Sequence, residues 1–278
     1  MKRNYLKYYI FVLIIQFYAI PCLYAQQWQL VYEENFNNFS VRDPNWLFEG
    51  TGRLNVRDVS RNPYLRITTE AGPVDKATVF WYRKPFRGDV RYRFRARAAN
   101  RTSALFFFNA NPTQDDSILD WVRPDALYKR YAGDRRLATY TLAILRSTRS
   151  FCKLRHIGGD AYRALSELSY EDFQTETILQ TYDSPFLHKP DRWFDFDVRV
   201  VEDGITVRID GKTEVSIVDT GNTGSAAYGW TPLTDGGWFA FRNSRPGYMD
   251  VDDIRVYEAK PASRPKPPGQ LSIEAIRP

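Results

Sequence analysis

The sequence contains few residues of the kinds that build disulfides, metal centres and nucleophilic sites. Its 278 residues include two cysteines, two histidines and two methionines. Cys22 lies in an apolar N-terminal segment that we expect to be removed, which leaves Cys152 as the single cysteine of the mature chain and excludes an internal disulfide. Cys152 stands in a strand-like run, and we interpret it as a buried, inert thiol. Stability must therefore come from a hydrophobic core.

Several catalytic signatures are also missing. The sequence has no Glu-x-Asp-x-x-Glu run, which on one strand would hold an acid and a nucleophile about 5 Å apart, so a retaining glycosidase of the sandwich type is not expected. It has neither a His-Glu-x-x-His nor a Cys-x-x-Cys motif. With His156 and His188 as its only histidines, a histidine-based catalytic metal is not expected either. No Gly-x-Ser-x-Gly motif is present, which excludes a nucleophile elbow.

The N-terminal segment has the three parts of a secretory signal peptide. Basic residues precede an apolar stretch of roughly 16 residues from Tyr8 to Leu23, and the small residue Ala25 follows it. We expect a signal peptide over 1–25 and a periplasmic or extracellular protein that has no membrane contact after cleavage. A membrane anchor is one alternative, but the stretch is shorter than the roughly 20 residues of a spanning helix and Pro21 interrupts it. A lipoprotein signal at Cys22 is the other.

Length and charge bound the rest of the chain. We expect one all-β domain over 26–258 and a Pro-rich tail over 259–278. The formal net charge is +6, with arginine prominent, which suits an acidic polysaccharide or oligosaccharide as partner. Nucleic acid would match the same charge, although we expect none. Because acidic residues are interspersed with the basic ones, an ordinary solvated surface is a further alternative. The oligomeric state is left open.

Alternation of apolar and polar residues with period two dominates the sequence, and helical periodicity is rare. With Gly, Pro, Asn and Asp at the breaks, this pattern predicts an all-β fold, a two-sheet antiparallel β-sandwich or jelly roll. Asp203-Gly204 and Asp210-Gly211 predict hairpins in a meander over Phe194–Val218. The polar segment Ala161–Tyr182 is interpreted as a long excursion from the sandwich. The predicted strands are Tyr64–Thr68, Ala77–Tyr82, Val90–Ala98, Ala104–Asn109, Thr139–Arg146, Phe151–His156, Phe194–Glu202, Ile205–Asp210, Gly237–Arg242 and Val251–Tyr257.

Six runs carry a resemblance to a known family. They are Leu30–Asn37, Val79–Trp81, Phe106–Ala110, Leu154–Gly159 and Gly237–Arg242 with the closing run Val251–Tyr257. Together they resemble the YesU-like family of concanavalin A-like bacterial proteins, which are often found among polysaccharide-utilisation genes and mostly lack an assigned activity. The resemblance extends over nearly the whole mature chain. It implies a concanavalin A-like sandwich and a carbohydrate ligand, although His156 stands where the family usually has Lys.

A cluster of Tyr, Arg, Lys and His residues between positions 120 and 160 supplies the candidate catalytic residues. In β-elimination from a uronic acid polymer, an arginine neutralises the carboxylate, a Tyr or His removes the adjacent proton, and a Tyr protonates the leaving oxygen. Tyr140, His156, Arg155 and Arg146 are the candidates for these roles. Strand alternation puts Tyr140 and Arg146 on one face and predicts that Lys153 and Arg155 face outward.

Nearby aromatic and polar residues are candidates for sugar contact. Trp121 and Trp230 lie in polar, loop-like surroundings and are better placed to stack on a sugar than tryptophans within strands. Asn109 follows an aromatic run, where it either reaches a ligand or satisfies a backbone group. The alternative is that the tyrosines fill the sandwich core. The candidate substrate-binding residues are Tyr128, Tyr131, Asn109, Trp121, Lys153 and Trp230.

Three hypotheses on function remain. The first is an exported carbohydrate-active protein, a polysaccharide lyase or hydrolase acting on acidic polysaccharide. The second is a non-catalytic carbohydrate-binding module, and the third is a structural scaffold. No cofactor is expected apart from a structural calcium ion, which the resemblance to concanavalin A-like domains places between the first and last strands. Its ligands would be Glu34 and Asp252.

Overall fold

The computed structural model describes most of the chain, which divides into two compact units. One unit is Gln29–Glu258. The other is formed by Met1–Trp28 and Ala259–Pro278, and within it the Lys260 N–H donates to the Gln27 carbonyl oxygen at 2.8 Å. The predicted signal peptide and residues 261–278 of the predicted tail lie outside the described residues, which are 26–40, 42–59, 61–69, 77–100, 102–113, 117–120, 126, 131, 136–145, 151–158, 177–221, 231–244 and 246–260. Within these ranges, no helix is long and apolar enough to cross a membrane.

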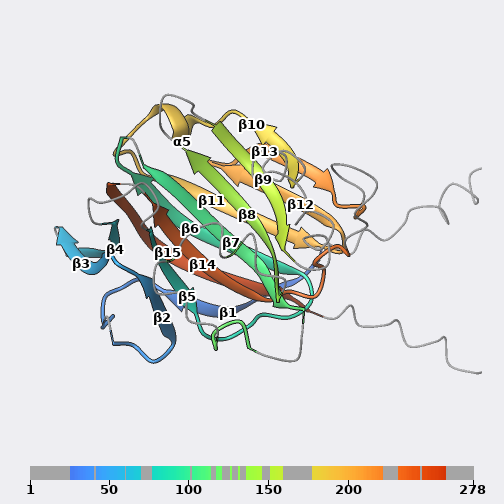
Figure 1. The fold of residues 1–278 in the computed structure, drawn as a ribbon, viewed down its shortest axis with the longest axis horizontal. Helices are drawn as coiled ribbons and strands as arrows, with labels where there is room; N and C mark the ends of the chain where they lie inside the picture. Colours follow the sequence, from blue (N-terminus) through green and yellow to red (C-terminus); the bar gives the residue numbers. More distant parts are fainter. Residues whose placement is uncertain are drawn as a thin grey trace, which may run out of the picture. The chain divides into compact units, whose positions relative to one another are not determined.

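The unit Gln29–Glu258 is built from two β-sheets (Figure 1). The larger one, here called sheet A, has the strand order β13-β12-β11-β6-β15-β4-β3, and β1 also pairs with β15. The last strand of the chain therefore lies in the middle of the sheet. The bounds are β1 (Trp28–Glu34), β3 (Arg53–Val59), β4 (Asn62–Thr69), β6 (Val90–Ala98), β11 (Phe194–Val201), β12 (Gly204–Ile209), β13 (Lys212–Val218) and β15 (Gly247–Ala259).

The second sheet, here called sheet B, has the strand order β10-β9-β8-β7-β14-β5-β2. Its neighbouring strands pair antiparallel, as do β3, β4, β6, β11, β12, β13 and β15 in sheet A. A short helix, α5 (Pro185–His188), follows β10 and is capped by the Ser184 side chain. The bounds of the strands are β2 (Trp46–Gly50), β5 (Ala77–Tyr82), β7 (Ser103–Pro112), β8 (Leu137–Leu145), β9 (Phe151–Gly158), β10 (Ile178–Tyr182) and β14 (Trp238–Ser244).

The predicted two-sheet antiparallel sandwich is confirmed, and each predicted strand coincides with an observed one. The predicted excursion Ala161–Tyr182 is wrong for Ile178–Tyr182, which forms β10; residues 161–176 lie outside the described part. The sequence also gives no prediction for β2 and β3. These three strands all lie at the ends of their sheets, where one neighbour is missing. Because a neighbour is missing, buried and exposed residues alternate only weakly along these strands. The alternation of apolar and polar residues in their sequences is correspondingly weak.

The two predicted hairpins are present as well. β11 and β12 are joined at Glu202-Asp203, and β12 and β13 at Asp210-Gly211. Asp210 and Gly211 both have positive φ, 50° and 79°, which is the conformation that a two-residue turn between twisted strands requires.

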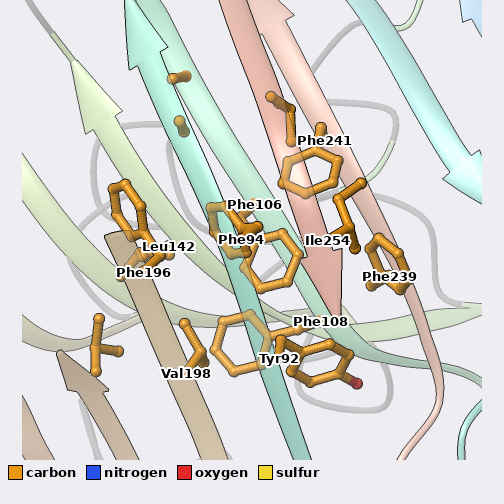
Figure 2. Close-up of a cluster of buried hydrophobic side chains, with 14 of the residues drawn as sticks. Tyr92, Phe94, Phe106, Phe108, Leu142, Phe196, Val198, Phe239, Phe241 and Ile254 are labelled. Carbon is orange, nitrogen blue, oxygen red and sulfur yellow. The ribbon is translucent and has the colours of Figure 1, made fainter. Parts of the chain in front are cut away.

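The main core fills the space between the two sheets. Figure 2 shows its centre, where rings from β6, β7, β11 and β14 meet one another. Phe106 is 4% exposed, and its ring centroid lies 4.7 Å from that of Phe94 and 5.2 Å from that of Phe241. Phe94 in turn stacks on Phe196 of β11 at 4.9 Å. Aromatic rings therefore join the two sheets at the centre of the core.

Sheet B is buried on its other face too. A second apolar cluster contains Val79, Trp81, Leu105, Phe107 and Ala240, whose strand neighbours belong to the main core. This arrangement explains the sequence of β7, Ser103–Pro112, in which apolar residues run without interruption because both faces are covered. In sheet A, by contrast, β6 alternates strictly, with apolar residues inward and arginines outward.

We expect Phe106→Ala to lower the free energy of unfolding by about 3–5 kcal/mol, because it removes a ring from the centre of the core. Phe48→Ala is the matched control: this ring, on β2, is 37% exposed, so its loss should cost much less. Urea unfolding followed by tryptophan fluorescence measures both. Equal losses for the two variants would show that the inter-sheet aromatic cluster does not dominate stability.

Candidate functional site

Two of the predicted catalytic residues meet on a shared carboxylate. Tyr140 of β8 and His156 of β9 are paired in register, so their side chains lie on the same face of sheet B. Both point toward the inside of the sandwich. The Tyr140 hydroxyl donates to Asp219 Oδ2 at 2.7 Å, and His156 Nδ1 lies 3.1 Å from the same oxygen. Asp219 directly follows β13, so the cluster joins sheet B to the end of sheet A.

Backbone groups fix this cluster in place. The Gly221 N–H donates to Asp219 Oδ1 at 3.0 Å, and the Leu233 N–H donates to the Tyr140 hydroxyl oxygen at 3.0 Å. Asn109 Nδ2 donates to the Leu233 carbonyl oxygen at 2.8 Å, while its Oδ1 accepts from the Tyr92 hydroxyl at 2.9 Å. Asn109 therefore satisfies a backbone group, one of the two roles considered for it. Its side chain is fully buried.

Burial and charge set the protonation of the cluster. Tyr140, His156 and Asp219 are each at most 2% exposed. Burial raises the pKa of Tyr140 far above its usual value, and the neighbouring Asp219 carboxylate raises it further. Burial also pushes the pKa of Asp219 upward, but the contacts from His156, Tyr140 and the Gly221 N–H outweigh it and hold that pKa below its usual value. An ionised Asp219 only accepts hydrogen bonds, so His156 Nδ1 carries a proton.

The predicted arginine lies on the other side of the sheet. Arg155 precedes His156 on β9, and strand alternation turns it to the outer face of sheet B, where its Nη1 donates to Thr177 Oγ1 at 2.8 Å. It faces outward from the sandwich as predicted, but it is only 2% exposed, because other parts of the chain cover this face. Lys153, also on this face, is half-buried, and burial with the nearby Arg155 charge lowers its pKa. Tyr140 and His156 therefore do not share a face with Arg155 or Lys153.

Tyr131 takes part in a second buried polar cluster on the outer face of sheet B. Its hydroxyl donates to Glu49 Oε2 at 2.6 Å, and Trp81 Nε1 donates to the same oxygen at 3.0 Å. Arg242 of β14 is 4% exposed and donates from Nε to the Ala126 carbonyl oxygen at 3.2 Å. All of these side chains are covered by other parts of the chain. These hydrogen bonds therefore hold Tyr131 and Ala126 against the outer face of sheet B.

Four further candidates, Arg146, Tyr128, Trp121 and Trp230, lie outside the described residues. The two proposed calcium ligands have separate partners: Glu34 Oε1 accepts from the Phe36 N–H at 2.6 Å, while Asp252 Oδ1 accepts from the Asp253 N–H at 2.8 Å. Burial raises the pKa of both carboxyl groups. Within the described part of the chain, no group of three or more His, Cys, Asp or Glu residues is arranged to hold a metal ion.

Asp219 and Glu49 are not among the site residues predicted from the sequence. Asp219 stands in an Asp-x-Gly run after a strand, which predicts a turn but not a partner 63 residues away in the sequence. Glu49 had a clearer signal, because it is an acidic residue within the apolar run Trp46–Gly50, and buried acids are rare unless they are paired.

Asp219→Asn tests the electrostatics of the interior cluster. Because the pKa of Asp219 is lowered in the folded protein, its carboxylate stabilises the fold above the unfolded pKa of about 3.9, and this contribution disappears as the pH falls through the folded pKa. We expect the variant to lose about 1–3 kcal/mol at neutral pH, with the difference from wild type shrinking below about pH 4. Urea unfolding at a series of pH values measures this. The control is Asp183→Asn, which alters the exposed Asp183–His188 pair and should change stability little. A deficit for Asp219→Asn that stays constant into acid would contradict the assignment.

Comparison with known proteins gives a fold and no family. No family model matches the chain, and no curated protein matches it either. Solved structures do match. A protein of unknown function with a galectin-like fold from Bacillus subtilis is 16% identical, with a TM-score of 0.63 over 84% of this chain and 99% of that one. An endo-β-1,3-glucanase from Pyrococcus furiosus is 14% identical, with a TM-score of 0.55 over 84% and 96%. The carbohydrate recognition domain of Emp47p is 9% identical, with a TM-score of 0.53 over 82% and 95%. The chain has the galectin-like sandwich fold that these proteins share.

Proposed function

We propose that this protein is exported and binds acidic polysaccharide without cleaving it. A carbohydrate recognition domain and a glucanase are built on the same sandwich, which supports a carbohydrate ligand for this chain as well. The net charge of +6 favours an acidic ligand over a neutral one. Membership of the YesU-like family, export through the predicted signal peptide and a periplasmic or extracellular location are parts of this proposal.

The position of Arg155 relative to His156 carries the preference for binding over catalysis. In the elimination scheme considered for these residues, one sugar residue touches an arginine and a proton-transferring Tyr or His together. Tyr140 and His156 face the interior and are at most 2% exposed, whereas Arg155 lies on the opposite face of β9. The raised pKa of Tyr140 also makes its phenolate, the form that would remove a proton, scarce at neutral pH. These residues are therefore arranged for stability.

A polysaccharide lyase is the second candidate. The observation in its favour is the contact of Tyr140 and His156 with one ionised carboxylate, since an aspartate that orients a histidine is a recurring device of general acid–base catalysis. Hydrolysis has less support. A sandwich glycosidase of the retaining type uses two carboxylates from a Glu-x-Asp-x-x-Glu run, and this sequence contains no such run. A structural calcium ion at Glu34 and Asp252 stays a prediction; in its support, Asp252 Oδ2 is buried and has no hydrogen-bond partner, although Arg95 Nη1 lies 3.9 Å from it.

Incubation with uronate polymers separates binding from elimination. We expect affinity gels containing polygalacturonate or alginate to retard the protein, and we expect no rise in the ultraviolet absorbance of unsaturated uronic products. Tyr140→Phe removes the hydroxyl and keeps the ring, so it should retain binding while lowering stability through the lost Asp219 hydrogen bond. Product formation by the wild type that Tyr140→Phe and His156→Ala each abolish, with folding intact, would establish the lyase in place of the binding protein.

A further inference from the structure

The outer face of sheet A is an arginine surface. Every second residue of β6 faces outward, and these residues are Arg91, Arg93, Arg95 and Arg97. Their inward neighbours Val90, Tyr92, Phe94, Ala96 and Ala98 all belong to the main core. On this face the arginines are half-buried or exposed, in contrast to the outer face of sheet B, where an apolar cluster covers the strands. Sheet A therefore presents a charged surface across its central strand.

Arg93 lies in a row of charged residues that crosses four strands. The register places Arg208 of β12 opposite Asp197 of β11, Asp197 opposite Arg93, and Arg93 opposite Arg255 of β15. The row thus contains one carboxylate and three guanidinium groups. Neighbouring strands lie about 4.8 Å apart, so the row extends roughly 14 Å across the sheet. Arg93 and Arg255 are like charges directly opposite one another, which destabilises a sheet, and Glu33 offsets part of this repulsion because it accepts from Arg255 at 2.7 Å.

The acids neutralise part of this surface: Arg95 lies 3.6 Å from Asp253, and Arg255 donates to Glu33 at 2.7 Å. Two other acids are each shared by two arginines. Asp197 accepts from Arg91 at 2.7 Å and from Arg199 at 2.8 Å, so two arginines share one carboxylate. Burial works against ionisation of Asp197, but hydrogen bonds from Arg199 and Arg91 outweigh it and hold its pKa at about 2. Asp250 is shared in the same way by Arg66 at 2.7 Å and Arg97 at 2.8 Å. Arg91 and Arg199 with Asp197, and Arg66 and Arg97 with Asp250, thus each combine two guanidinium groups with one carboxylate.

Arg93 and Arg208 keep free donors. Arg93 is exposed and forms no ion pair with any residue that the structure describes. Arg208 Nε is buried without a hydrogen-bond partner. A guanidinium group has five N–H donors in a planar fork that matches a carboxylate or sulfate. The two residues flank Asp197: Arg93 offers an exposed guanidinium group, and Arg208 carries one buried N–H that the protein itself does not use.

Aromatic rings hold other arginines of this face in fixed positions. Arg66 lies over the ring of Tyr248, with its Cζ atom 3.7 Å from the centroid, and Arg97 lies between Tyr64 at 5.0 Å and Trp193 at 4.8 Å. A guanidinium group that stacks on a ring and bonds to a carboxylate loses little further freedom when a ligand binds. The surface is therefore preorganised for anionic groups.

We infer that the outer face of sheet A, centred on Arg93, binds a polysaccharide that carries carboxylate or sulfate groups. This inference rests on the proposed function and adds the surface and the residues that would perform it. Single-stranded nucleic acid fits this face less well, because it binds to free aromatic rings on which bases stack. Here the rings of Tyr248 and Tyr64 are engaged by Arg66 and Arg97, and Tyr64 is buried. The chemistry shared by the ligands is an oxyanion on a sugar.

Arg93→Glu tests the inference, with Arg42→Glu as the matched control. Both side chains are exposed, and both variants replace an arginine by a glutamate, so they change the net charge equally. Arg42 serves as the control because it lies in the loop before β2 of sheet B and not on β6. Calorimetric titration with oligogalacturonate, a sulfated dextran oligomer, neutral dextran and an oligothymidylate compares the ligands. We expect Arg93→Glu to raise the Kd for the anionic sugars about tenfold or more. Arg42→Glu should leave the Kd within about twofold of the wild-type value. Added salt should weaken wild-type binding to the same ligands.

Arg208→Gln provides a second variant in the same row and should also weaken binding, and circular dichroism checks that every variant is folded. Binding of only the uronate or only the sulfated sugar, with loss in Arg93→Glu, supports the inference and identifies the anionic group. Equal effects of Arg93→Glu and Arg42→Glu, or binding of neutral dextran alone, would overturn this surface while carbohydrate binding stands. Binding of the oligothymidylate that depends on Arg93, with no sugar bound, would overturn the ligand class. If no polysaccharide binds at all, the proposed function itself is wrong.

Discussion

The burial of sheet B on both of its faces is the constraint on which the rest of this structure depends. The main core covers one face through residues such as Phe106 and Phe108, and the second apolar cluster covers the other through Trp81 and Phe107. Polar groups in this sheet must therefore find partners inside the protein, and Glu49 and Asp219 supply them. Sheet A is buried on one face only, so its outer face is free to hold charge.

Strand alternation then decides which side chains can act together. On β9, His156 joins the interior cluster with Tyr140, while Arg155, one residue earlier, lies on the outer face beside Thr177. His156 and Arg155 are adjacent in the sequence, but alternation places one in the interior and the other on the outer face of sheet B. On β6 the same rule has the opposite effect, because residues at every second position gather on one face. Four arginines with an unremarkable spacing in sequence become one surface.

The sequence predicts the fold where burial imposes a pattern. β5 and β6 have the predicted bounds because each of their residues is either clearly buried or clearly in a polar row. The edge strands β2, β3 and β10 have one neighbour each and carry too weak a pattern. The site was harder to predict, since Asp219 contacts Tyr140 across 79 residues and Glu49 contacts Tyr131 across 82. Local spacing holds no information on such contacts, whereas alternation correctly put Lys153 and Arg155 on the face opposite Leu154.

The central position of β15 in sheet A has a consequence for the order of folding. This strand is Gly247–Ala259, near the end of the chain, and it pairs with β6 and β4, which precede it by more than 150 residues. Until β15 inserts, β6 and β4 each have an unpaired edge. Sheet A therefore closes only through pairings between residues that are far apart in the sequence, whereas the meander β11-β12-β13 is joined by short turns. We expect the meander to form early in folding and the centre of sheet A to form late.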